Sequence, residues 1–140
     1  MRARAYRVLC GGLGGLWIVG GLVLISFFFR FHSAGFRGEQ PELPLPLDAW
    51  GVYMAAMAGC AMVAWGGGLL GAARRGADGR SIGTASALAL SLMALYRIVG
   101  WVVGEYPAAA DALRVEAAVF LLLALAFVWL RPQRPAAAAA

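Results

Sequence analysis

Apolar residues are gathered into four long runs, and the short stretches between the runs hold most of the charges. The runs cover residues 8–29, 49–73, 82–103 and 112–130. Each has about the 20 residues that an α-helix needs to cross the hydrocarbon core of a bilayer. The pattern predicts an all-α integral membrane four-helix bundle, built as a single domain over residues 1–131, with a disordered tail at 132–140.

Composition supports the membrane class. Of the 140 residues, 62% are hydrophobic and 14% are charged, and the mean hydropathy is +0.76. Soluble domains are only about half apolar and about a quarter charged. The basic start of the chain resembles that of a signal peptide, but the first run is longer than the roughly 7–15 apolar residues of such peptides. We therefore expect the first helix to remain in the mature protein.

All twelve basic residues are arginines, and their positions predict the orientation of the helices. Short connections rich in arginine stay on the cytoplasmic side of a membrane. The arginines near the two termini and in the 74–80 connection therefore predict that both termini face the cytoplasm of a bacterial inner membrane. Because the arginines bracket the apolar runs and form no single patch, the net charge of +5 indicates membrane lipid as the partner and not nucleic acid.

The longest connection, residues 31–48, lies outside in this orientation. Pro41, Pro44 and Pro46 oppose a helix there and favour extended or polyproline backbone. Asp48 is suited to cap the helix that follows. The connection is either a plain spacer or a lid over an outward-facing cavity, and the sequence leaves both open.

Small residues on the helices predict close packing, because apolar helices in lipid associate where small side chains let their backbones approach. The spacings that suggest such stripes are Gly11 with Gly15, Gly20 with Gly21, Gly51 with Ala55 and Gly59, Gly67 with Gly71, and Gly83 with Ala87 and Ser91. The same stripes are also compatible with a homodimer face on either of the first two helices.

Arg97 lies inside the third apolar run, seven residues before Gly104. At 1.5 Å of rise per residue, it sits about 10 Å below the outer end of its helix. A charge at that depth normally turns inward and finds a partner. In an antiparallel hairpin with its turn at 105–108, Glu116 is the residue at the same depth. We therefore predict a buried Arg97–Glu116 ion pair.

Two tyrosines join this pair as candidate ligand-binding residues. Tyr53 falls at similar depth on the second helix, and Tyr96 precedes Arg97. Arg114 lies about 200° around its helix from Glu116 and should point elsewhere. Two roles stay open for the pair. It either latches the last two helices together, or forms the polar floor of an outward-facing cavity that binds a headgroup, a quinone or a small amphiphile.

No motif in the sequence assigns catalysis. The single histidine and the two cysteines have no metal-ligand spacing, and no nucleophile or phosphate-loop signature is present. We predict no catalytic residue and no metal site. Whether the chain belongs to an enzyme is left open, but we expect no activity from it alone.

Several segments resemble the DoxX-like small bacterial membrane proteins, in particular a branch without an assigned activity. These segments are WGVYMAAMAG, ALYRIVGWVVG and LRVEAAVFLLLALAFVWLRP. In that branch an arginine and a glycine on the third helix and a glutamate on the fourth recur, and Arg97, Gly100 and Glu116 match them. The resemblance implies a four-helix bundle and no established activity.

Two functional hypotheses result. The first is a small accessory membrane protein that binds a lipid or another small ligand. The alternative, which follows from the resemblance, is a quinone- or lipid-handling subunit of a membrane oxidoreductase complex. The oligomeric state is left open between a homodimer and a larger complex.

Overall fold

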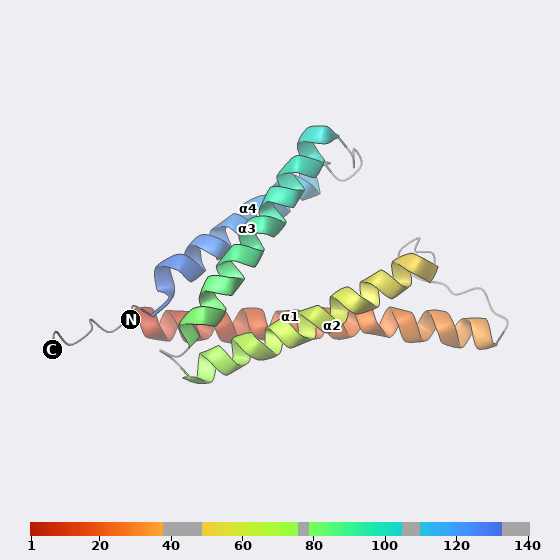
Figure 1. Cartoon of the computed structure of the whole chain (residues 1–140), viewed down its shortest axis with the longest axis horizontal. Helices are drawn as coiled ribbons and strands as arrows, with labels where there is room; N and C mark the ends of the chain where they lie inside the picture. Colours follow the sequence, from red (N-terminus) through yellow and green to blue (C-terminus); the bar gives the residue numbers. More distant parts are fainter. Residues whose placement is uncertain (38–48, 76–78, 105–109, 133–140) are drawn as a thin grey trace. The chain divides into compact units, whose positions relative to one another are not determined.

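The chain folds into four α-helices within the residues that the computed structural model describes, which are 1–37, 49–75, 79–104 and 110–132. They are α1 (Arg2–Phe36), α2 (Ala49–Arg75), α3 (Arg80–Val103) and α4 (Ala110–Leu130) (Figure 1). Those ranges hold no β-strand. The predicted all-α architecture with four helices is confirmed.

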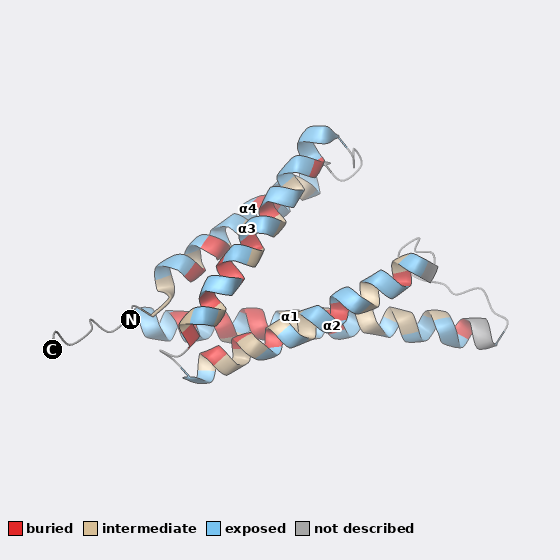
Figure 2. Ribbon diagram, in the orientation of Figure 1, coloured by how far each residue is buried: buried red, intermediate tan, exposed pale blue. Residues whose placement is uncertain are grey.

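Each of the four helices is long and apolar enough to cross a membrane. The qualifying segments are Arg2–Ala34, Trp50–Arg75, Arg80–Val103 and Asp111–Leu130. Figure 2 shows that exposed residues cover much of every helix and that buried residues are confined to narrower stretches. By length and composition, the chain is therefore a multi-pass membrane protein.

The observed helices agree with the predicted runs except at α1. This helix extends about two turns beyond the predicted run at its start and two at its end. At its start the helix continues through Arg2, Ala3, Arg4 and Ala5, because arginine and alanine are strong helix formers. The α3 helix ends at Val103, and its cap Gly104 has a φ of 72°, a left-handed conformation that glycine adopts without strain.

Several predicted features lie outside the described residues. They are the proline-rich section with Pro41, Pro44 and Pro46, the Asp48 cap, the turn at 105–108, and the tail after Pro132. The observed end of α1 moves the start of the first connection from residue 31 to beyond Phe36.

The described helices belong to two compact units. One, the α1–α2 unit, is Gly11–Gly71. The other, the α3–α4 unit, combines Met1–Cys10 with Ala72–Ala140. The first turns of α1 therefore belong to the unit that contains α3 and α4.

Four glycines hold the α1–α2 unit together. A Cβ added to Gly21 would stand 2.5 Å from the Gly59 carbonyl oxygen, and one on Gly66 would stand 2.6 Å from that of Gly14. Real Cβ atoms do not approach an oxygen so closely, so only glycine lets the two backbones touch at these points. Gly14 meets Gly66 and Gly21 meets Gly59, which makes α1 and α2 an antiparallel pair.

Gly21 and Gly59 were among the small residues predicted to pack, but the predicted pairs Gly11 with Gly15 and Gly67 with Gly71 were wrong for this contact. Gly11, Gly15, Gly67 and Gly71 have no heavy atom within 4 Å of an added Cβ. The contacting glycines are instead seven residues apart on each helix. A seven-residue repeat keeps one seam facing a nearly aligned neighbour, whereas a GxxxG contact belongs to a steeper crossing.

The α3–α4 unit is also an antiparallel pair. The start of α3 meets the end of α4, where Arg131 donates a hydrogen bond to the Thr84 hydroxyl (3.1 Å). Closer to the far ends, Arg97 contacts Glu116. Small and apolar side chains are buried along the two helices, among them Ala87, Leu90, Ala94, Ala117, Ala124 and Phe127.

Tyr6 connects the first turns of α1 to α3 and α4 in this unit. Its hydroxyl donates a buried hydrogen bond to the Gly79 carbonyl oxygen (2.6 Å), and its ring packs edge-on against Phe127. Gly83 makes room for the ring, because a Cβ there would stand 2.5 Å from the Tyr6 hydroxyl. Gly83 and Ala87 are buried as the predicted stripe requires, but Ser91 is exposed.

We call the four contacting residues Gly14, Gly21, Gly59 and Gly66 the glycine seam. Substitution within this seam should destabilise the protein. We expect Gly21→Ala to lower the free energy of unfolding by about 1–3 kcal/mol, because the added methyl group overlaps the Gly59 carbonyl. Gly67→Ala is the matched control. It meets open space, and alanine favours the helix, so stability should be unchanged or slightly raised. Unfolding by SDS titration, followed by circular dichroism, measures both. Equal losses in the two variants would contradict the seam.

Removal of the Tyr6 hydroxyl should also weaken the fold. Tyr6→Phe leaves the buried Gly79 carbonyl without this donor, and we expect a loss of about 1–3 kcal/mol in the same titration. Tyr96→Phe is the control, because Tyr96 is exposed and changes at exposed positions usually alter stability by less than about 0.5 kcal/mol. A Tyr6→Phe variant as stable as wild type would show that the bond contributes nothing.

Candidate functional site

Arg97 on α3 and Glu116 on α4 form the ion pair that the sequence predicts. The Arg97 Nε donates a hydrogen bond to Glu116 Oε2 at 2.6 Å. The antiparallel register of α3 and α4 brings the two residues together, because each lies at the same distance from the connection between the helices. The predicted pairing is confirmed.

The pair is less buried than predicted. The Arg97 side chain is 30% exposed and that of Glu116 is 50% exposed. The prediction of a buried pair was wrong because the small residues Ala94, Gly100 and Ala117 occupy buried positions of these helices. The charged pair thus lies at the surface of the α3–α4 unit.

Aromatic rings surround the guanidinium of Arg97. Its Cζ lies 5.8 Å from the centre of the Tyr96 ring and 5.8 Å from that of Phe120. Both are within the range of a cation–π interaction. Because only Nε bonds Glu116, the terminal Nη groups make no hydrogen bond within the described part of the chain. Charge, two NH2 donor groups and an exposed tyrosine therefore meet on one surface.

The other predicted site residues take different positions. Tyr53 belongs to the α1–α2 unit, where its ring stacks on Trp50 at 5.6 Å between centroids. Its predicted hydrogen bond to the pair stays a prediction. Arg114 bonds Asp111 and lies over the Trp101 ring, so the expectation that it points away from Glu116 is confirmed.

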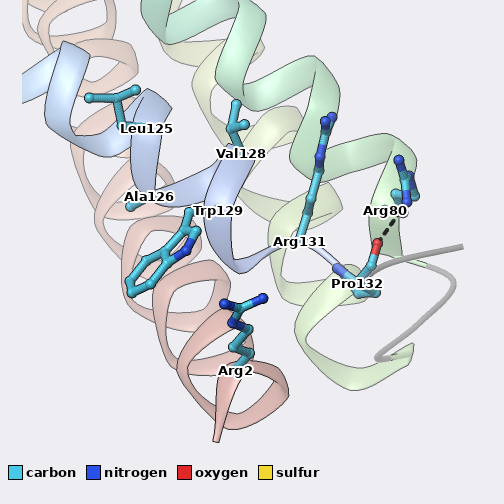
Figure 3. A pocket seen from close by; sticks show the side chains of 8 residues that line it. All are labelled: Arg2, Arg80, Leu125, Ala126, Val128, Trp129, Arg131 and Pro132. Atoms are coloured by element: carbon cyan, nitrogen blue, oxygen red, sulfur yellow. Dashed lines mark hydrogen bonds between the residues drawn. The ribbon is translucent and has the colours of Figure 1, made fainter.

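A second charged site lies at the opposite end of the α3–α4 unit. It is a cavity of about 610 Å³. Figure 3 shows its lining, which comes from the start of α1, the start of α3 and the end of α4. The lining residues are Arg2, Arg80, Leu125, Ala126, Val128, Trp129, Arg131 and Pro132.

Each arginine of this cavity contacts an uncharged group. Arg2 lies over the Trp129 ring, with its Cζ 5.5 Å from the ring centre. Arg80 donates a hydrogen bond to the Pro132 carbonyl oxygen (3.0 Å), and Arg131 donates one to the Thr84 hydroxyl. We call these eight lining residues the arginine cavity.

Sequence reasoning missed the arginine cavity. It treated Arg2, Arg80 and Arg131 only as markers of orientation. The signal was nevertheless present, because the predicted topology already placed all three arginines at the same end of the helices. Whether the three arginines line one cavity depends on the directions of their side chains, and the spacing of residues along the chain does not give those directions.

Comparison with protein-family models, with curated proteins and with solved structures found no significant match. The candidate sites therefore rest on their own geometry and chemistry.

The Arg97–Glu116 pair should contribute to the free energy of unfolding, and the contributions of its two residues should be coupled. In detergent micelles, Arg97→Met or Glu116→Gln alone should lower the free energy of unfolding by up to about 3 kcal/mol, since each leaves one charge in an apolar surface without its partner. The double variant should recover part of that loss. The control pair is Asp111 and Arg114, whose side chains are 93% and 54% exposed, and we expect its removal to cost less than about 1 kcal/mol. SDS titration tests this, and strictly additive losses at Arg97 and Glu116 would contradict coupling.

Proposed function

We propose that this chain is an accessory protein of a bacterial inner membrane that binds a small amphiphile or lipid at the Arg97–Glu116 pair. The observation that carries the proposal is the exposure of the pair. In a membrane-spanning helix an exposed side chain faces lipid, and a charge pair that faces lipid carries a desolvation cost that the polar group of a bound ligand would lower. Here the Glu116 carboxylate is half exposed, and the Arg97 Nη groups bond no residue in the described part of the chain.

The surroundings favour an amphiphile as the ligand. Exposed apolar residues flank the pair on both helices, among them Ile98, Val115 and Val119. A ligand with a polar end would place that end at Arg97, and its apolar part would lie along these side chains. Tyr96 and, in the predicted topology, Tyr53 complete the candidate site.

We also propose that both termini face the cytoplasm. The grouping of Arg2, Arg80 and Arg131 around one cavity supports the placement of these helix ends on the same side of the membrane. Arginine-rich ends are retained on the cytoplasmic side. The Arg97–Glu116 pair would then lie in the outer half of the bilayer.

The alternative proposal is a quinone- or lipid-handling subunit of a membrane oxidoreductase complex, in line with the DoxX-like resemblance. The contacts of Arg97 with the Tyr96 and Phe120 rings favour it. Quinone carbonyls accept hydrogen bonds from a guanidinium, and a flat quinone ring packs well on aromatic side chains. Electron transfer would be the task of a partner chain in this case.

Ligand capture tests the proposal directly. Wild-type protein extracted from bacterial membranes into nanodiscs should release a small amphiphile on organic extraction, detected by mass spectrometry. The Arg97→Met/Glu116→Gln double variant should fold and release at least tenfold less. The matched control is the Arg114→Met/Asp111→Asn double variant, which should retain the ligand.

Two outcomes decide between the alternatives. A bound quinone, or a redox protein that stays attached through purification, supports the oxidoreductase subunit. A monomer or homodimer that carries another lipid supports the accessory protein. If the folded Arg97 and Glu116 double variant retains as much amphiphile as wild type, the pair is only a latch and the binding proposal is wrong.

A further inference from the structure

The arginine cavity concentrates positive charge without a counter-charge from the lining. Three of its eight described lining residues are arginines, and none of the eight is acidic. The three guanidiniums contact a tryptophan ring, a backbone carbonyl and a threonine hydroxyl. Like charges repel one another, and none of these contacts neutralises them. The cavity is therefore suited to an anion.

The donor set indicates which kind of anion. A guanidinium carries five N–H donors, and its planar fork fits the oxygens of a phosphate group. Arg80 and Arg131 each use one terminal nitrogen for a bond within the protein, and the Arg2 Cζ lies over the Trp129 ring. Within the described residues each arginine thus keeps N–H groups for a ligand, and three such forks match a phosphate better than a carboxylate.

The rest of the lining distinguishes a lipid phosphate from a free one. A cavity of about 610 Å³ is much larger than one phosphate ion. The apolar residues of its wall, Leu125, Val128 and Trp129, are themselves exposed on α4, with Leu125 at 64% and Trp129 at 68%. The cavity is therefore continuous with a surface that faces hydrocarbon in a membrane-spanning helix.

The position of the cavity also fits the binding of a lipid phosphate. It lies at the ends of three membrane-spanning helices, where the bilayer surface presents its headgroups. Tryptophan is enriched at this level of a membrane, because its ring is apolar and its N–H is polar. Figure 3 shows Arg2 beside the Trp129 ring and the Arg80 and Arg131 side chains on the side of α3. Basic pockets between transmembrane helices are a recognised way to hold anionic headgroups.

We propose that the arginine cavity binds the phosphate headgroup of an anionic phospholipid, with Arg2, Arg80 and Arg131 as its ligands and Trp129 and Leu125 against the start of the acyl chains. This site is separate from the Arg97–Glu116 pair, and it does not depend on the function proposed for that pair.

Native mass spectrometry of the full-length chain tests the site. Detergent-purified protein is titrated with phosphatidylglycerol or with phosphatidylcholine of the same acyl chains. We expect wild type to bind phosphatidylglycerol at least tenfold more tightly. Each arginine near an anionic lipid contributes about fivefold in affinity, so the Arg2→Gln/Arg80→Gln/Arg131→Gln variant should lose about a hundredfold and with it the preference.

The control removes the same charge from outside the cavity. Arg4, Arg7 and Arg74 are exposed arginines that do not line it, and their triple glutamine variant should keep the preference for phosphatidylglycerol. Equal losses in the two triple variants would reduce the effect to general surface charge and overturn the proposal. Equal binding of the two lipids by wild type would overturn it as well.

Two further measurements separate the remaining outcomes. Inorganic phosphate at millimolar concentration should not displace the lipid, and displacement would assign the cavity to a free anion. If the triple variant fails to fold, Arg2→Gln alone replaces it, because among the described residues Arg2 contacts the cavity wall through the Trp129 ring and donates no hydrogen bond to it. That variant should bind phosphatidylglycerol about fivefold more weakly, and unchanged affinity would contradict the site.

Discussion

An apolar helix gains little from leaving lipid to contact another apolar helix, since hydrocarbon tails are as apolar as leucine. The structure depends on this constraint. Each helix pair is held at the few positions that are either small enough for backbone contact or polar enough to require a partner. In the α1–α2 unit these positions are Gly14, Gly21, Gly59 and Gly66. In the α3–α4 unit polar side chains predominate, namely Tyr6, Arg80, Arg97 and Arg131.

The two kinds of contact differ in what they require of the sequence. A glycine seam requires only the absence of a side chain and gives tight packing with no charge. A polar contact fixes which residue meets which, because a donor without an acceptor is costly in hydrocarbon. The same contacts also provide chemistry. The two candidate sites of this chain lie in the α3–α4 unit, where arginines that hold the helices keep unused N–H groups.

Much of the fold could be predicted from the sequence, because membrane spans obey a simple length rule. The α2, α3 and α4 helices begin and end within about two residues of the predicted runs. The Arg97–Glu116 pair was also predictable, since depth in an antiparallel hairpin follows from distance to the turn. Of the seam glycines, Gly21 and Gly59 were among the predicted small residues, but Gly14 and Gly66 were not. A chain with 19 glycines offers many small-residue spacings, and the crossing of the helices decides among them. The arginine cavity was missed for a related reason, as it depends on three side chains from three helices.

The hydrogen bond from Tyr6 to Gly79 has a consequence for the order of assembly. Its two partners are 73 residues apart, and ribosomes add about 5–20 residues per second. The hydroxyl of Tyr6 therefore waits on the order of 4–15 s for its acceptor to be made. Gly66, the last residue of the glycine seam, is synthesised before Gly79, so α1 can close against α2 first. Because Phe127 of α4 also packs on Tyr6, the N-terminal turns of α1 complete their contacts only after α3 and α4 have been made.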